Sequence, residues 1–277
     1  MRARTPRQML AGALTRAERA VRGIRRRLQR PAARGQTGRP NDADEWAGLY
    51  AETLEPVRTL NSPVARVLEG LTRPGERVLE TGCGSATLSA ELAVAGRQIE
   101  LGDFSADILE RARRLFAASG LPAPGITLCD LSQRLPWDDG AVDVTWSSGV
   151  LEHWTDEELL PIVREQARIT RRRVISLVPH SGSLAYRWGK WIAEQDGPWP
   201  YGREIPRATL RPVFEAAGLA QVTEDTVWTE ASLNFLDFID PEVRRQAVRW
   251  WDSLPADDPV RRGQGYLLLT VGEVRHP

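Results

Sequence analysis

The sequence has few of the residues that would indicate a disulfide framework, a zinc site or a membrane segment. It contains only two cysteines, Cys83 and Cys129, with no Cys-X-X-Cys or Cys/His spacing, so neither a disulfide-stapled fold nor a metal site is predicted. No run of 18 apolar residues is present, so no segment is predicted to cross a membrane as a helix. No apolar stretch of signal-peptide length follows the basic N-terminus. We therefore expect a metal-free protein of the reducing cytoplasm.

The net charge of zero conceals an asymmetry along the chain. Residues 1–41 hold twelve arginines and one acid, Glu18, and so carry a charge of about +11. Residues 42–277 hold 25 basic and 36 acidic residues. This division predicts a basic segment attached to an acidic globular domain. Because such a domain repels a phosphate backbone, nucleic acid is not an expected partner.

The basic segment has the pattern of an amphipathic helix followed by a linker. One apolar stripe recurs at spacings of three and four residues, and arginines surround it. The stripe consists of Leu10, Leu14, Ala17, Val21, Ile24 and Leu28. Such a helix can lie on an anionic membrane or dock on a protein partner, and it can equally pack on its own domain or remain a loosely held tail. The sequence does not indicate an oligomeric state.

From residue 42 onward the pattern alternates between strands and helices, with nearly every strand followed by a helix. Strands are predicted at 78–80, 98–102, 126–129, 142–147, 174–178, 220–228 and 266–271. Helices are predicted at 43–53, 62–71, 85–95, 106–119, 156–169, 207–217 and 241–251. This alternation predicts a Rossmann-like α/β fold, in which a mostly parallel sheet carries helices on both faces. In such sheets the ligand lies beyond the carboxyl ends of the strands.

A glycine turn follows the first predicted strand. Glu80, Gly82 and Gly84 stand where the chain passes from strand to helix, and glycine allows the backbone to turn tightly and to approach a ligand. Two glycines alone are weak evidence for a nucleotide. The third glycine of the dinucleotide fingerprint is replaced by Thr87, which argues against NAD as the ligand.

Acidic residues follow the next two predicted strands. Asp103 and Phe104 come after the second strand, where a carboxylate can accept both hydroxyls of a ribose and an aromatic ring can cover an adenine. Asp103 could instead cap the next helix, although Ser105 suits that position better. Asp130 follows the third strand. Alone it is typical of a turn, but its place beside Asp103 favours a ligand contact.

Two of the three histidines follow predicted strands. His153 comes after the fourth strand and His180 after the fifth, whereas His276 is next to the C-terminus. A histidine at a strand end is commonly structural. Two of them at the ligand edge favour chemistry, because histidine transfers protons near neutral pH.

Several of these segments together resemble the class I S-adenosylmethionine-dependent methyltransferases, in particular the small-molecule branch similar to methyltransferase type 11. The matching segments are VLETGCGSATLSAELA, LGDFSADILERAR and CDLSQRLPWDDGAVDVTWSSGVLEHW. The resemblance covers roughly residues 43–275 and implies a seven-stranded sheet with an antiparallel last strand. It implies S-adenosyl-L-methionine as the cofactor and a small or medium metabolite, methylated on O or N, as the acceptor. Natural-product, glycosylated and lipid-linked acceptors all fit it.

The resemblance also implies roles for individual residues around the cofactor. It assigns the glycine turn to the methionine part, the strand-two acid to the ribose and the strand-three acid to the adenine amino group. The implied cofactor-binding residues are Glu80, Gly82, Cys83, Gly84, Asp103, Phe104, Asp130, Leu131, Ser147, Trp46 and Tyr50. His153 and His180 are the candidate bases, with His153 slightly favoured by the VLEH segment. One departure is Thr170–Arg173, which stands where the family has a Pro-Gly-Gly turn before strand five.

An aromatic-rich insertion interrupts the alternation at about residues 183–206. Insertions at this edge commonly form a lid over the acceptor, and aromatic side chains suit stacking. Packing of the insertion on the body explains any one of these aromatics equally well. The candidate acceptor contacts are Tyr186, Trp188, Trp191, Trp199, Tyr201 and Arg203.

Two other functions remain open from the sequence. An NAD-dependent oxidoreductase is disfavoured by the missing glycine and by the acid after strand three. A protein that binds S-adenosylmethionine without catalysis, with the basic helix as its working surface, is disfavoured by the intact set of site residues.

Overall fold

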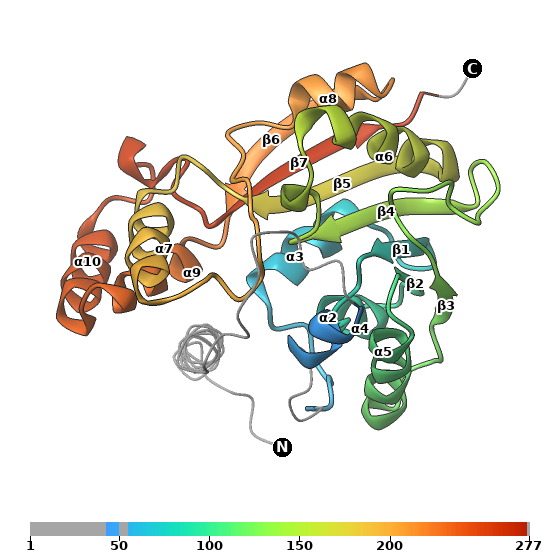
Figure 1. The fold of residues 1–277 in the computed structure, drawn as a ribbon, viewed down its shortest axis with the longest axis horizontal. Helices are drawn as coiled ribbons and strands as arrows, with labels where there is room; N and C mark the ends of the chain where they lie inside the picture. Colours follow the sequence, from blue (N-terminus) through green and yellow to red (C-terminus); the bar gives the residue numbers. More distant parts are fainter. Residues whose placement is uncertain (1–42, 50–54, 276–277) are drawn as a thin grey trace. The chain divides into compact units, whose positions relative to one another are not determined.

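The computed structural model describes residues 43–49 and 55–275 (Figure 1). The predicted basic helix and linker, Tyr50 and His276 lie outside these residues. The described chain divides into two compact units. The sheet unit comprises the described parts of Pro40–Val178, Thr209–Glu224 and Leu269–Pro277, and the helical unit comprises Pro179–Ala208 and Asp225–Leu268. Within the described ranges, no helix combines the length and the apolar character that a membrane crossing requires.

The strands form one seven-stranded sheet in the order β3-β2-β1-β4-β5-β7-β6. β1 pairs in parallel with β2 and β4, β2 with β3, and β4 with β5, whereas the last strands are antiparallel. The predicted Rossmann-like fold and its antiparallel last strand are therefore confirmed. The strands are β1 Arg77–Thr81, β2 Gln98–Asp103, β3 Gly125–Leu128, β4 Val142–Ser148, β5 Thr170–Pro179, β6 Ala220–Val227 and β7 Leu267–Glu273.

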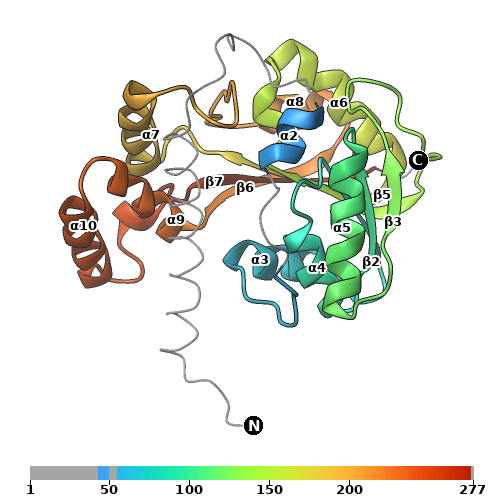
Figure 2. The ribbon, with the colours of Figure 1, turned by 60° about the horizontal axis from the view of Figure 1, so that its bottom comes forward.

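Helices cover both faces of the parallel strands in the sheet unit. α4 and α5 lie on one face, and α6 and α8 lie on the other (Figures 1 and 2). The starts of α5 and α6 follow from local chemistry, because Ser105 caps α5 through the Ile108 N–H and Thr155 forms a capping box with Glu158. The helices of this unit are α2 Ala43–Leu49, α3 Pro63–Leu71, α4 Thr87–Val94, α5 Ala106–Ser119, α6 Asp156–Ile169 and α8 Arg211–Ala216.

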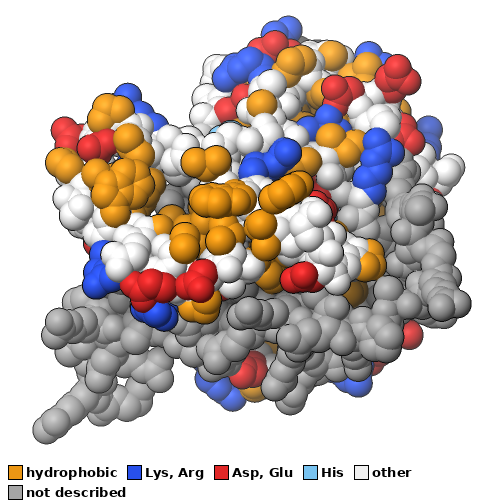
Figure 3. Space-filling view, turned by 60° about the vertical axis from the view of Figure 1, so that its left-hand side comes forward, with side chains coloured by type: hydrophobic (Ala, Val, Ile, Leu, Met, Phe, Trp, Pro, Cys, Tyr) orange, Lys and Arg blue, Asp and Glu red, His pale blue; other side chains and the backbone are white. Residues whose placement is uncertain are grey.

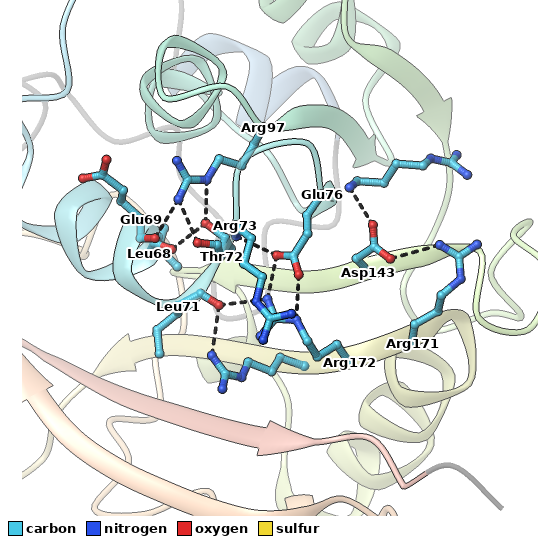
Figure 4. A network of polar contacts seen from close by, with 12 residues as sticks. Leu68, Glu69, Leu71, Thr72, Arg73, Glu76, Arg97, Asp143, Arg171 and Arg172 are labelled. Atoms are coloured by element: carbon cyan, nitrogen blue, oxygen red, sulfur yellow. Dashed lines mark hydrogen bonds and ion pairs between the residues drawn. The ribbon is translucent and has the colours of Figure 1, made fainter.

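The segment Thr170–Arg173 is part of β5, so the prediction of a loop before this strand is wrong. Its arginines are held by partners at the amino ends of the strands (Figure 4). Arg172 donates to both carboxylate oxygens of Glu76, at 2.7 and 2.6 Å, and to the Leu71 carbonyl at 3.1 Å. Arg173 donates to the same carbonyl at 3.1 Å. Cations at the end of α3 offset its unpaired carbonyls and complement its dipole.

The helical unit is built around an aromatic core. It contains α7 Leu184–Asp196, α9 Thr229–Asn234, η2 Phe235–Phe238, α10 Pro241–Ser253 and η3 Pro259–Arg261. α7 packs closely on η2 at Gly189, where an added Cβ would lie only 2.0 Å from the Phe235 carbonyl oxygen. The predicted insertion therefore contains a helix whose inner face belongs to a core, together with later parts of the chain.

Candidate functional site

The glycine turn after β1 is the best-defined part of the carboxyl edge. Gly82 and Gly84 have φ angles of 69° and 47°, in the left-handed region that favours glycine. The Gly82 N–H donates to the Gly102 carbonyl at 2.7 Å, which ties the turn to β2. A Cβ at Gly82 would lie 2.7 Å from Cγ2 of Val150. Both the backbone and the space around it therefore require glycine at this position.

Asp103 joins the end of β2 to this turn. Its buried carboxylate accepts hydrogen bonds from the Gly84 N–H at 3.3 Å and from the Ser105 N–H at 3.0 Å. Burial raises the pKa of Asp103, and the N–H donors of Ser105 and Gly84 oppose this rise. Phe104, which follows it, exposes 40% of its surface. The predicted acid and aromatic residue therefore lie beside the glycine turn.

Glu80 and Ser147 present polar atoms with no protein partner at the same edge. Glu80 Oε2 and Ser147 Oγ are buried and make no hydrogen bond within the described residues. Burial raises the pKa of Glu80 to about 8, the Ser89 hydroxyl opposes this rise, and Asp103 adds to it. Buried polar atoms of this kind cost free energy unless a ligand or water satisfies them. They fit a ligand that carries hydrogen-bond donors, as the amino group of an amino acid does.

The residues that follow β3 give less support for a ligand site than those that follow β1 and β2. Asp130 is exposed, and its Oδ1 accepts from the N–H and the hydroxyl of Ser132, both at 2.8 Å, which is the turn role that the sequence also allowed. Leu131 beside it is buried. Burial raises the pKa of the Cys129 thiol to about 12 and that of the Cys83 thiol well above its usual value, so neither free cysteine is an activated nucleophile.

The two candidate bases belong to different units. His153 ends the short helix η1 Leu151–His153 in the sheet unit, and its buried ring meets Trp46 edge-on at 5.4 Å between centroids. His180 lies in the helical unit, where its backbone N–H donates to the Tyr266 carbonyl at 2.8 Å. A Cβ at Gly182 would lie 2.7 Å from the His180 ring. Across the described residues, no group of three or more His, Cys, Asp and Glu is placed to hold a metal ion.

The aromatic residues of the insertion fall into two groups, and the first is structural. Tyr186 and Trp199 are buried and donate to the Glu204 carboxylate at 3.2 and 2.6 Å. Lys190 Nζ lies 3.7 Å from the same carboxylate and 4.3 Å from the centroid of the Trp199 ring. Burial raises the pKa of Glu204, and Lys190 opposes the rise. Glu204, which the sequence did not indicate, thus holds the part of the insertion that follows α7 against that helix.

The second group, Trp188 and Trp191, is exposed on the other face of α7 together with Leu184. Leu184, Trp188 and Trp191 follow each other at spacings of four and three residues, and they expose 69%, 48% and 58% of their surface. The side of the molecule that carries α7 and α10 shows hydrophobic side chains gathered at the surface (Figure 3). Arg203 is also exposed, and Tyr201 is half-buried against Trp199, 6.0 Å away between ring centroids.

The parallel sheet, with the glycine turn and the buried acid after β2 at its carboxyl edge, defines a Rossmann-like fold. Residues 78–173 match the family described as "Methyltransferase domain". These residues are therefore similar to a methyltransferase domain, in agreement with the resemblance to the class I S-adenosylmethionine-dependent methyltransferases.

The chain is also similar to curated proteins, one of them uncharacterized and one a methyltransferase. A Streptomyces fradiae protein described as an uncharacterized 37.1 kDa protein in a transposon is 34% identical over 38% of this chain and 30% of its own length. A Serratia marcescens malonyl-[acyl-carrier protein] O-methyltransferase is 29% identical over 56% of this chain and 58% of its own length. The chain thus spans less than two thirds of these relatives.

The fold is also that of a solved methyltransferase. The structure of magnesium protoporphyrin IX methyltransferase from Synechocystis with bound S-adenosylhomocysteine superposes with a TM-score of 0.50. The match covers 84% of this chain and 93% of that one at 18% identity. At this identity the likeness concerns the fold alone.

Proposed function

We propose that this protein binds S-adenosylmethionine at the carboxyl edge of its sheet and transfers the methyl group to O or N of a small or medium metabolite. The observation that carries the proposal is the contact between the Asp103 carboxylate and the Gly84 N–H. It places an acid able to bind a ribose next to a turn whose glycines leave room for a ligand. The unsatisfied atoms of Glu80 and Ser147 support the amino-acid part of the same ligand.

Removal of the Asp103 carboxylate tests the cofactor site. Hydrogen bonds to a charged group contribute about 1.5–3 kcal/mol, so Asp103→Ala should weaken S-adenosylhomocysteine binding by about 10- to 150-fold. Asp107, in the first turn of α5 and exposed, provides the matched control, and Asp107→Ala should leave the affinity unchanged. Titration calorimetry measures both. Full affinity in Asp103→Ala would remove Asp103 from the site.

The chemistry asked of the protein is modest. When bound, the cofactor supplies a methyl group on an activated sulfonium. The chain must hold the acceptor atom in line with that methyl group, within about 3–3.5 Å, and accept a proton if the acceptor is a hydroxyl or an ammonium group.

We assign the proton transfer to His153 rather than to His180. The assignment rests on the position of His153 in the same unit as the glycine turn and on its contact with Trp46. His153→Gln should slow methyl transfer by about 10²- to 10⁴-fold with little effect on S-adenosylhomocysteine affinity. The assay follows a labelled methyl group into the small-molecule fraction of an extract. A loss of this size in His180→Gln, with His153→Gln unaffected, would reverse the assignment.

For the acceptor we propose contacts with the exposed aromatic residues of the insertion rather than with the buried ones. Trp188 and Trp191 are exposed, which suits them to stacking, whereas Tyr186 and Trp199 are engaged with Glu204. Trp188→Ala should raise the KM for the acceptor. Trp250, which is 52% exposed on α10, supplies the control, and an equal effect of Trp250→Ala would contradict this proposal.

A further inference from the structure

A chain of buried polar side chains lies beneath the glycine turn. Gln166 on α6 donates from Nε2 to Thr81 Oγ1 at 3.0 Å, and the Thr81 hydroxyl lies 3.4 Å from the Trp146 carbonyl oxygen. The backbone carbonyl of Gln166 accepts from Thr170 Oγ1 at 2.6 Å, and Thr170 Oγ1 lies 2.6 Å from Thr145 Oγ1. The four polar side chains are at most 2% exposed.

The protons of this chain can be assigned from its contacts. The Thr81 hydroxyl accepts from Gln166, so its own proton points to the Trp146 carbonyl. Since the Thr170 hydroxyl donates to the backbone carbonyl of Gln166, the Thr145 hydroxyl must donate to the Thr170 hydroxyl. Every hydroxyl proton therefore has an acceptor, as a buried polar network requires if it is to stabilise one arrangement.

The network connects the two strand ends that carry the proposed cofactor contacts. Thr81 is the last residue of β1 and directly precedes Gly82. Trp146 directly precedes Ser147 near the end of β4. The Gln166 side chain thus holds Thr81, whose hydroxyl in turn reaches β4, at the last residue before the turn.

Gln166 occupies a position where an apolar residue would suffice for packing. The inward face of α6 consists of Leu159, Ile162, Val163, Gln166 and Ile169, at helical spacing. A leucine has a similar size and lacks the cost of burying an amide. The amide therefore contributes directed hydrogen bonding to the end of β1, which apolar packing does not provide.

We propose that Gln166 is a positioning residue, which holds the Gly82 turn in the conformation that receives the cofactor. The inference rests on the proposed function. Without the amide, the turn would sample other conformations, and cofactor binding would have to order it again. The expected loss is that of one hydrogen bond, about 3- to 10-fold.

The first test follows the Gly82 amide in the unliganded protein by hydrogen exchange. Gln166→Leu should speed exchange of the Gly82 N–H, which donates to Gly102, by about 3- to 10-fold relative to amides in the middle of β1. Val163→Ala is a core truncation on the same face of α6 that does not touch the network. It should change the exchange of the Gly82 amide and of the amides in the middle of β1 alike, in proportion to global stability. Thr81→Ser should behave as wild type and Thr81→Val as Gln166→Leu.

The second test measures S-adenosylhomocysteine affinity in the same variants. Gln166→Leu and Thr81→Val should each lose about 3- to 10-fold, and their combination should lose no more than either alone, since both break one contact. Unchanged Gly82 exchange in Gln166→Leu, relative to Val163→Ala, would overturn the inference. If wild type bound no S-adenosylhomocysteine, the proposed function would fail, and the exchange experiment would still decide the role of Gln166.

Discussion

A methyl group added to Gly82 tests the geometry of the turn most sharply. In Gly82→Ala the new Cβ meets two atoms of one side chain, Val150 Cγ2 at 2.7 Å and Cγ1 at 3.3 Å. The backbone also stays at φ 69°, which alanine adopts with strain. The substitution therefore combines a conformational cost with a steric one.

The two costs can be separated because the chain offers a matched position. Gly120, at the end of α5, has φ 68° and nothing within 4 Å of an added Cβ. Gly120→Ala should thus show the backbone cost alone, about 1–2 kcal/mol. Overpacking adds about 1–3 kcal/mol at Gly82, and this difference corresponds to about 2–12 °C in melting temperature.

Urea unfolding of four proteins measures the steric part directly: wild type, Gly82→Ala, Val150→Ala and the double variant. Val150→Ala removes both clashing atoms and leaves only the Cβ contact at 3.6 Å, so Gly82→Ala should then cost no more than Gly120→Ala. The double-mutant cycle should give a coupling energy of about 1–3 kcal/mol. Additive effects would refute the close approach of Val150 to the turn.

Three further predictions concern ionisable side chains. Because the pKa of Glu80 is about 8 in the folded protein against 4.5 for the free side chain, the folded state holds a proton that the unfolded chain releases, and the free energy of unfolding should fall between about pH 5 and 8. Glu80→Gln should lack this decline in urea titrations. Arg172→Ala should lower stability by about 1–3 kcal/mol because it removes the ion pair with Glu76 and one of the two arginine contacts to the Leu71 carbonyl. Arg113→Ala, in an exposed pair, should change thermal unfolding little. Glu204→Ala should loosen the part of the insertion that carries Trp199 and so alter tryptophan fluorescence. An unaltered spectrum would contradict the role of Glu204 in holding that segment.

Much of the sheet unit could be predicted because its signals are local. The strand and helix alternation placed Gly82, Gly84 and Asp103 at one edge, and Ser105 indicated the start of α5, which the structure confirms. Parallel sheets impose these positions through their topology alone. A loop was predicted at Thr170–Arg173 because the family has a Pro-Gly-Gly turn there, whereas these residues extend β5 and their arginines have partners far along the sequence.

The insertion and the buried network could not be read from local patterns. Because no helix was predicted at α7, the sequence could not indicate that Tyr186 lies on its buried face and Trp188 on its exposed face. Glu204 and Gln166 are ordinary polar residues in the sequence, and their roles arise from tertiary contacts. Only a polar residue within the apolar stripe of α6 gave a signal for Gln166.

The central claim is that the carboxyl edge binds S-adenosylmethionine, and one calorimetric comparison tests it most directly. Wild-type protein is titrated separately with S-adenosylhomocysteine and with NAD. We predict saturable one-to-one binding of S-adenosylhomocysteine and none of NAD at the same concentrations. Binding of NAD without binding of S-adenosylhomocysteine would contradict the account.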